Sequence, residues 1–117
     1  MERQFRLRAN EDFQRVRREG RSWSSPLLVL IAAPNAADHT RFGFAVGKRI
    51  GKAVVRNRVK RRLREAVRLH CEAVAPGWDL VFVAREPILA ASFGDIESAI
   101  CGLMQRAQVA NCRRVSP

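Results

Sequence analysis

Tyrosine is absent from this chain of 117 residues, and its aromatic side chains are limited to two Trp and six Phe. A broad aromatic surface for stacking RNA bases is therefore not predicted. Cysteine is also scarce, with three residues, an odd number, and no C-x-x-C pair. Neither a disulfide framework nor a zinc finger is expected from so few thiols. The simplest interpretation is a cytoplasmic protein whose cysteines stay reduced.

Long apolar runs are lacking as well. Met1 leads into polar residues, and no stretch approaches the roughly 18 apolar residues of a membrane span, so neither a signal peptide nor a membrane partner is predicted. Repeats are not evident, and the length suits one domain over residues 1–117. Within it, residues 1–9 and 110–117 are expected to be flexible basic tails.

Acidic residues are the third shortage, because 11 Asp and Glu face 22 Lys and Arg, a net charge of +11. A compact domain this basic usually binds nucleic acid. Seven cationic residues and one anionic residue fall within residues 56–68. Apolar residues recur there at helical spacing, which predicts an amphipathic helix over about 54–72. Its buried face would comprise Val55, Val59, Leu63, Ala66 and Val67.

The opposite face of this helix is predicted to be a cationic ridge. It would comprise Asn57, Lys60, Arg61, Arg64 and Arg68, with Arg58 and Arg62 along one flank. Only Glu65 is available to pair, with Arg61 or Arg62, so most of the charge lacks a counterion. Planar guanidinium groups suit phosphate contacts. Nucleic acid is therefore the favoured partner, and a solvated helix face or an acidic membrane surface are the alternatives.

The stretch from Gly47 to Glu65, GKRIGKAVVRNRVKRRLRE, resembles the signature of the protein subunit of bacterial ribonuclease P. That family has a strand ending in a G/S-K-(K/R)-I-G turn, followed by a helix that opens with Arg-Asn-Arg and continues Lys-Arg-x-x-Arg. Each of these positions is matched, and the resemblance extends over about residues 6–107. It implies a subunit that binds the ribonuclease P RNA and precursor tRNA and assists removal of the 5′ leader.

The resemblance also implies roles for individual residues. In this family the RNA subunit and its Mg²⁺ ions perform the hydrolysis, so no catalytic residue and no metal or cofactor site is expected in the protein. Contact with the catalytic RNA is expected from Lys48, Arg49, Lys52, Arg56, Asn57, Arg58, Lys60, Arg61, Arg64 and Arg68. A cleft for the leader is expected to involve Phe13, Arg17, Ile31, Gly43 and Ala45.

Two of these cleft positions depart from the family. Arg17 and Ile31 stand where aromatic residues are frequent, so base stacking should be weaker here than in typical members. Phe13 keeps the aromatic, although a core position explains it equally well. Gly43 and Ala45 alternate with large apolar residues and leave room on one strand face, either for a packed helix or for a nucleic-acid backbone.

The expected fold is α+β, a two-layer sandwich in the order α-β-β-(β)-α-β-α, where the bracketed strand is short. By resemblance, this layout is similar to domain two of small-subunit ribosomal protein five. Asn10 is a candidate N-cap and Gly20 a candidate stop for the first helix, and Ser92 and Asp95 form a capping box for the last. The elements are expected at about 11–19 (helix), 22–33 and 40–46 (strands), 54–72 (helix), 79–85 (strand) and 93–107 (helix).

Other functions are considered as alternatives. A structural RNA-binding protein of the ribosomal type, or a regulator that places the basic helix in the DNA major groove, would share the charge pattern. A self-sufficient nuclease would need a metal or acid–base cluster, and no H-E-x-x-H motif or paired His is visible. The nearest acidic pair is Asp95 and Glu97, and the helix cap accounts for Asp95. Duplex DNA is not the expected partner.

Overall fold

The structure is a computed structural model that describes residues 5–7, 9–70 and 73–110. Its regular elements follow one another along the chain in the predicted α+β order. They are α1 (Asn10–Glu19), β1 (Arg21–Ser24), β2 (Leu28–Pro34), β3 (Arg41–Ala45), η2 (Lys48–Ile50), α2 (Ala53–Arg68), β4 (Trp78–Ala84), η4 (Glu86–Ala90) and α3 (Phe93–Arg106), where η marks a 3-10 helix.

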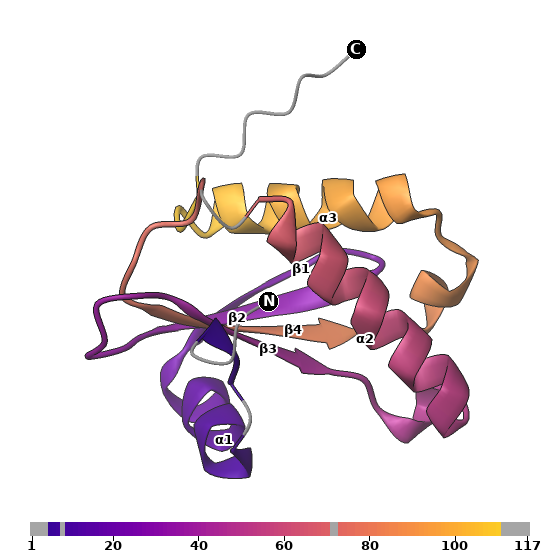
Figure 1. The fold of residues 1–117 in the computed structure, drawn as a ribbon, viewed down its shortest axis with the longest axis horizontal. Coiled ribbons are helices and arrows are strands. Elements are labelled where there is room, and N and C mark those ends of the chain that lie inside the picture. The colour runs from indigo at the N-terminus through magenta and orange to yellow at the C-terminus, as the bar shows by residue number, and fades with distance from the viewer. Residues whose placement is uncertain (1–4, 8, 71–72, 111–117) are drawn as a thin grey trace.

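The four strands form one sheet in the order β1-β2-β4-β3. Neighbours β1 and β2, and β2 and β4, are antiparallel, whereas β3 and β4 are parallel and are joined through α2. Helices α2 and α3 cover one face of the sheet and α1 lies on the other (Figure 1). The predicted mixed fold is confirmed, but the single strand expected over 22–33 is divided into β1 and β2, because the chain turns between Ser24 and Leu28.

The main core lies between the sheet and the pair α2 and α3. Alternate residues of the strands, such as Leu28, Leu30 and Phe82, point into it because side chains along a strand face opposite sides in turn. From α2, the buried residues are Val59, Leu63, Ala66 and Val67, which are four of the five predicted. Val55 packs against the margin of the same core. The apolar face of α2 is therefore assigned correctly.

A smaller apolar cluster lies under α1. Its buried members are Leu7, Val16, Ala33 and Val81. The Leu7 amide donates a hydrogen bond to the Phe42 carbonyl oxygen, 2.8 Å away, which attaches this segment to the edge of β3. The tail expected over residues 1–9 is thus packed at Leu7, whereas residues 1–4, 8 and 111–117 lie outside the described part of the chain.

The helix ends agree with the sequence in part. The Ser92 hydroxyl accepts from the Asp95 amide at 3.0 Å and the Asp95 carboxylate accepts from the Ser92 amide, so the predicted capping box is confirmed. Gly20 ends α1 as predicted. The predicted N-cap, Asn10, is wrong by one position, because Asn10 already lies in the first turn and Ala9 is the N-cap. Helix α2 ends at Arg68, and the expected residues 71–72 are outside the described chain.

Gly20 also brings α1 close to the sheet. A Cβ atom at this position would lie 2.8 Å from the Ala32 carbonyl oxygen of β2, and 2.5 Å from that of Val16. Such contacts with backbone atoms leave no space for a side chain.

Among the described residues, no helix is both long and apolar enough to cross a membrane.

The burial pattern of α2 predicts opposite effects for two neighbouring substitutions. Leu63 is fully buried, so Leu63→Ala should lower the free energy of unfolding by about 2–5 kcal/mol. Arg61 is exposed, so Arg61→Ala should leave it almost unchanged. Urea denaturation of both variants measures the difference. The face assignment would be reversed if Arg61→Ala were the destabilising change.

Candidate RNA-binding surfaces

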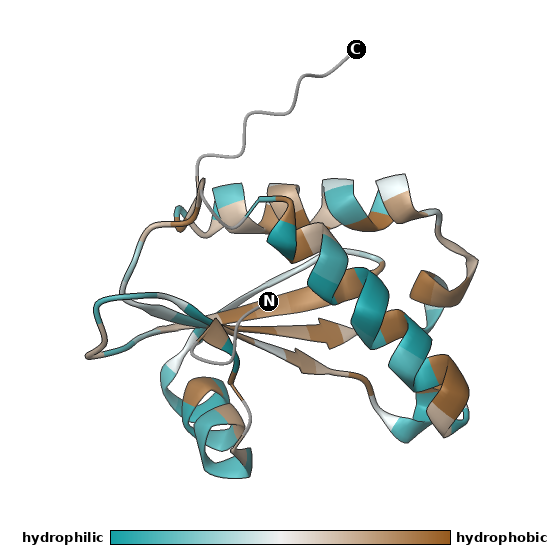
Figure 2. Cartoon of the chain, viewed as in Figure 1, coloured by the Kyte–Doolittle hydropathy of each residue, from teal (hydrophilic) through white to brown (hydrophobic). Residues whose placement is uncertain are grey.

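The outer side of α2 is polar after its first turn, where Val54 is exposed (Figure 2), and the exposed cationic and amide side chains that follow form the surface we call the α2 ridge. The α2 ridge consists of Asn57, Arg58, Arg61 and Arg68. Glu65 lies beside it and binds Arg68 through two hydrogen bonds of 2.9 and 2.5 Å, so the predicted pairing with Arg61 or Arg62 is wrong. The i,i+3 spacing places these two side chains together.

The other guanidinium groups of the outer side of α2 carry charges that no carboxylate of the described residues pairs with. Within the described part of the chain, neither Arg58, Arg61 nor Arg62 forms a salt bridge. Fixed like charges on a rigid helix repel one another, and a polyanion laid along the helix removes that repulsion. The geometry therefore suits a phosphate backbone.

The turn before α2 extends this cationic surface. Lys48, Arg49 and Lys52 are exposed, whereas Ile50 is buried and anchors η2 to the core. Arg56 is half-buried, and its Nε donates to the Gly51 carbonyl oxygen at 3.1 Å. Arg56 therefore stabilises the turn that presents the three exposed side chains, in addition to any contact it makes with a ligand.

Lys60 and Arg64 are not on the outer face, which corrects the prediction for both. Each follows a buried residue by one position, so the helix turns it by only about 100° from the core, and both are half-buried at the side facing β3. They border a hollow of about 330 Å³. The other residues lining this hollow are Arg6, Leu7, Phe13, Phe42 and Phe44.

The charge of Arg64 is poorly compensated in this hollow. Its Nε atom is buried and has no hydrogen-bond partner within the described residues. Burial lowers the pKa of Arg64, and the nearby charge of Arg6 lowers it further. Two guanidinium groups and Lys60 thus meet beside three phenylalanine rings without an acidic residue, an arrangement that favours an anionic aromatic ligand.

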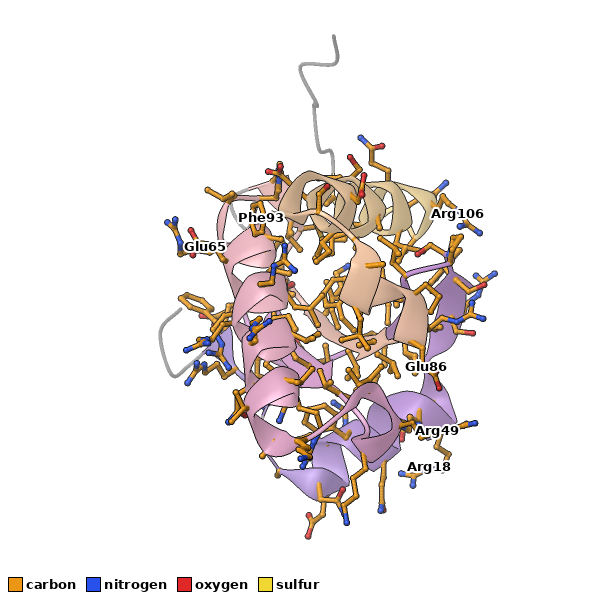
Figure 3. The ribbon with its side chains drawn as sticks, turned by 90° about the vertical axis from the view of Figure 1, so that its right-hand side faces the viewer. Arg18, Arg49, Glu65, Glu86, Phe93 and Arg106 are labelled. Carbon is orange, nitrogen blue, oxygen red and sulfur yellow. The ribbon has the colours of Figure 1, made fainter. Side chains whose placement is uncertain are left out.

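A groove of about 670 Å³, larger than the hollow, opens beyond the ends of β3 and β4, and we call it the cleft. Ala45 and Val83 of its lining belong to the apolar cluster under α1, whereas Phe44, Ile50 and Lys60 lie on the α2 side. Ala45 and Val83 are paired across β3 and β4 and form part of its floor. Arg17 of α1, Arg49 of η2 and Arg85 after β4 contribute cationic groups to its lining. Figure 3 shows that Arg49 and Arg18, the neighbour of Arg17, lie at the same end of the molecule.

The five residues predicted for the leader cleft are therefore divided by the structure. Arg17 and Ala45 line the cleft, and Phe13 lines the adjoining hollow. Gly43 is buried directly under Phe13, where a Cβ atom would lie 2.8 Å from the Phe13 Cζ atom. Of the two alternatives for the space on this strand face, a packed helix or a nucleic-acid backbone, the structure has the helix at Gly43. Ile31 is half-buried beside Gly20, beneath α1.

Sequence reasoning missed Val83 and Arg85 as lining residues. Val83 belongs to a continuous apolar run, and such a run does not reveal which residues face which side of the sheet. Arg85 directly follows the end of β4, and it belongs to no sequence motif that would have indicated a place in the cleft.

A buried ionic network behind α1 was also missed. The Asp79 side chain has no exposed surface, and its carboxylate accepts from Arg41 Nε at 2.9 Å, from Arg41 Nη2 at 2.7 Å and from Asn35 Nδ2 at 2.8 Å. Arg15 of α1 donates to the same carboxylate. Burial alone would raise the pKa of Asp79, but the hydrogen bonds from Arg41 and Asn35 lower it overall. The one feature of the sequence that could have indicated this network is an Asp at the start of an otherwise apolar strand.

Asp79 should therefore make stability depend on pH. Because its folded-state pKa lies below the ordinary value of 3.8, its contribution is complete above that pH and is lost as the pH falls through the folded value. Asp79→Asn should cost about 3 kcal/mol at pH 7, since Arg41 and Arg15 both lose their buried carboxylate partner and Arg15 keeps, among the described residues, only the partly exposed Glu19, 3.7 Å away. Urea titrations at pH 7 and pH 3 test this. The gap between wild type and variant should narrow at pH 3, and a gap independent of pH would contradict the assignment.

Comparison with known proteins agrees with this arrangement. The family model described as Ribonuclease P matches residues 1–108. Relatives include the ribonuclease P protein component of Roseiflexus castenholzii, 54% identical over 93% of this chain and 90% of that protein, and that of Clostridium botulinum, 42% identical over 91% and 96%.

Solved structures give the same result. The Staphylococcus aureus RNase P protein is 31% identical and covers 92% of this chain and 98% of its own, with a TM-score of 0.84. The Thermotoga maritima protein is 30% identical over 86% and 96%, with a TM-score of 0.79. The chain therefore belongs to the ribonuclease P protein family, the protein subunits of the enzyme that matures the 5′ end of tRNA.

Proposed function

We propose that the α2 ridge docks on the RNA subunit of ribonuclease P, while the cleft at the ends of β3 and β4 receives the 5′ leader of precursor tRNA. The observation that supports this division is the separation of two kinds of surface. The α2 ridge is exposed, convex and purely polar, which suits the backbone of a folded RNA. The cleft and the adjoining hollow combine cations with Ala, Val and Phe, which suits an extended single strand.

Lys60 and Arg64 lie between these two surfaces. They belong to α2, yet they border the hollow beside Phe13 and Phe42. Under this proposal their charges meet phosphates where the leader leaves the RNA subunit, and an anion there would satisfy the buried Arg64 Nε atom. Lys48, Arg49 and Lys52 would then extend the RNA-docking surface along the turn.

The chemistry of cleavage is assigned to the RNA subunit. The described residues include no group of three or more His, Cys, Asp or Glu side chains arranged to hold a metal ion. In this proposal the protein's residues bind and orient the substrate, and the Mg²⁺ ions that the reaction uses would be held by RNA. The holoenzyme, rather than this chain, would be the endoribonuclease, acting in the cytoplasm where precursor tRNA is made.

Arg58→Ala and Arg61→Ala should each weaken assembly with the ribonuclease P RNA by about 1–3 kcal/mol, the value of a charge-assisted contact. Arg106→Ala is the matched control, because this exposed arginine lies on α3, away from α2 (Figure 3). Filter binding at a fixed salt concentration measures the three dissociation constants. Equal losses for all three variants would mean that the effect is net charge and not the α2 ridge.

Phe13→Ala should raise the dissociation constant for precursor tRNA several-fold in the reconstituted holoenzyme, while mature tRNA binding and subunit assembly stay unchanged. Stacking on an aromatic ring is worth about 1–3 kcal/mol per base, and only precursor tRNA carries a leader. Phe93→Ala is the control, since Phe93 is similarly half-buried but belongs to α3. The leader role of Phe13 would be lost if the ratio of the two constants did not change.

A further inference from the structure

Helix α1 is held on the sheet mainly by a few contacts. Val16 is its one buried residue among those described, whereas α2 buries four residues and α3 buries five. Its first half rests on β3, where Phe13 packs over Gly43, and its end rests on β2, where Gly20 lies against Ala32. So small an apolar contact area leaves rotation of the helix about its own axis weakly defined.

The ionic network of Asp79 acts on the side of α1 away from the cleft. Along β4, Asp79 precedes Val83 by four residues on the same sheet face, a separation of about 13 Å. Val83 is in the floor of the cleft, and Asp79 is at the opposite end of that face beside Arg41. The axis of α1 therefore passes between the cleft and the carboxylate.

The spacing within α1 matches this arrangement. Phe13 and Arg17 are four residues apart and project from one side of the helix, toward the hollow and the cleft. Arg15 lies two residues from each, about 200° around the helix, and projects toward Asp79. One ion pair thus restrains the side of the helix opposite the two residues assigned to the leader.

The acceptor of this ion pair is itself fixed. Asp79 is held by the bidentate contact with Arg41 of β3 and by Asn35, whose amide also donates to the Trp78 carbonyl oxygen at 2.9 Å. A buried pair of this kind adds little net stability, because desolvation of the charges offsets most of their attraction, but it accepts few geometries. The ion pair is therefore expected to affect the orientation of α1 more than the net stability of the fold.

We propose that Arg15 and Asp79 are positioning residues for leader binding: their ion pair sets the rotation of α1, and thereby places Phe13 and Arg17 at the cleft. The inference depends on the proposed leader-binding role of the cleft. It predicts that Arg15, which does not line the cleft or the hollow, contributes to leader affinity only through residues that do.

The test uses holoenzyme reconstituted with ribonuclease P RNA and compares dissociation constants for precursor and mature tRNA. Arg15→Met and Arg15→Gln both remove the ion pair, so the test can be made if either variant folds. Arg15→Lys keeps the positive charge at this position. Arg18→Met is the matched control, because the Arg18 side chain is 69% exposed and its ion pair is with Glu19 at 3.6 Å. The expected result is a several-fold loss of preference for precursor tRNA in Arg15→Met or Arg15→Gln, partial recovery in Arg15→Lys and no loss in Arg18→Met.

A double-mutant cycle with Phe13→Ala separates positioning from a general loss of stability. The cycle is made in a background that carries Arg17→Met, so that Phe13 is the remaining residue through which Arg15 can act. If Arg15 acts through Phe13, adding Arg15→Met to Phe13→Ala in this background lowers the preference little further. Fully additive losses, or an equal loss of mature tRNA binding, would overturn the inference. An unchanged preference in folded Arg15 variants would overturn it while leaving the cleft assignment intact, provided that Phe13→Ala lowers the preference. An unchanged preference in Phe13→Ala would remove the cleft assignment and the inference with it.

Discussion

The burial of one face of α2 is the constraint on which the rest of the molecule depends. Val59, Leu63, Ala66 and Val67 fix both the depth and the rotation of the helix against the sheet. Once the depth and rotation of the helix are set, Arg58 and Arg61 face solvent. The packing of the core offsets the repulsion between their charges. The apolar half of the helix thus supplies the free energy that keeps a cationic surface assembled before any RNA is bound.

The opposite face of the sheet is organised by different forces. There the apolar cluster is small, and α1 is attached through glycine contacts and through the buried carboxylate of Asp79. Polar groups of this kind specify orientation more than they stabilise. The molecule therefore combines a firmly packed side, which carries the proposed RNA-docking ridge, with a side whose geometry depends on few residues and which borders the proposed leader cleft. Sequence departures such as Arg17 and Ile31 would have most effect there.

The helical period of residues 55–67 was enough to predict the buried face of α2, because each turn repeats the pattern. Period and spacing did not predict that Lys60 and Arg64 are half-buried, since residues beside the apolar stripe are placed by neighbouring elements, here β3 and the segment around Leu7. The Asp79 network joins residues 15, 35, 41 and 79, and no local pattern connects positions so distant in sequence. Likewise, the small residue Gly43 indicated close approach but not that Phe13 fills the space.

The central claim is that this chain assists an RNA catalyst and does not cleave RNA itself. Reconstitution tests it most directly: cleavage of precursor tRNA is measured at low Mg²⁺ with a bacterial ribonuclease P RNA alone, with this chain alone and with both together. The account predicts rapid removal of the 5′ leader only when both are present. Cleavage by the chain without the RNA, or an RNA whose activity the chain does not raise, would contradict it.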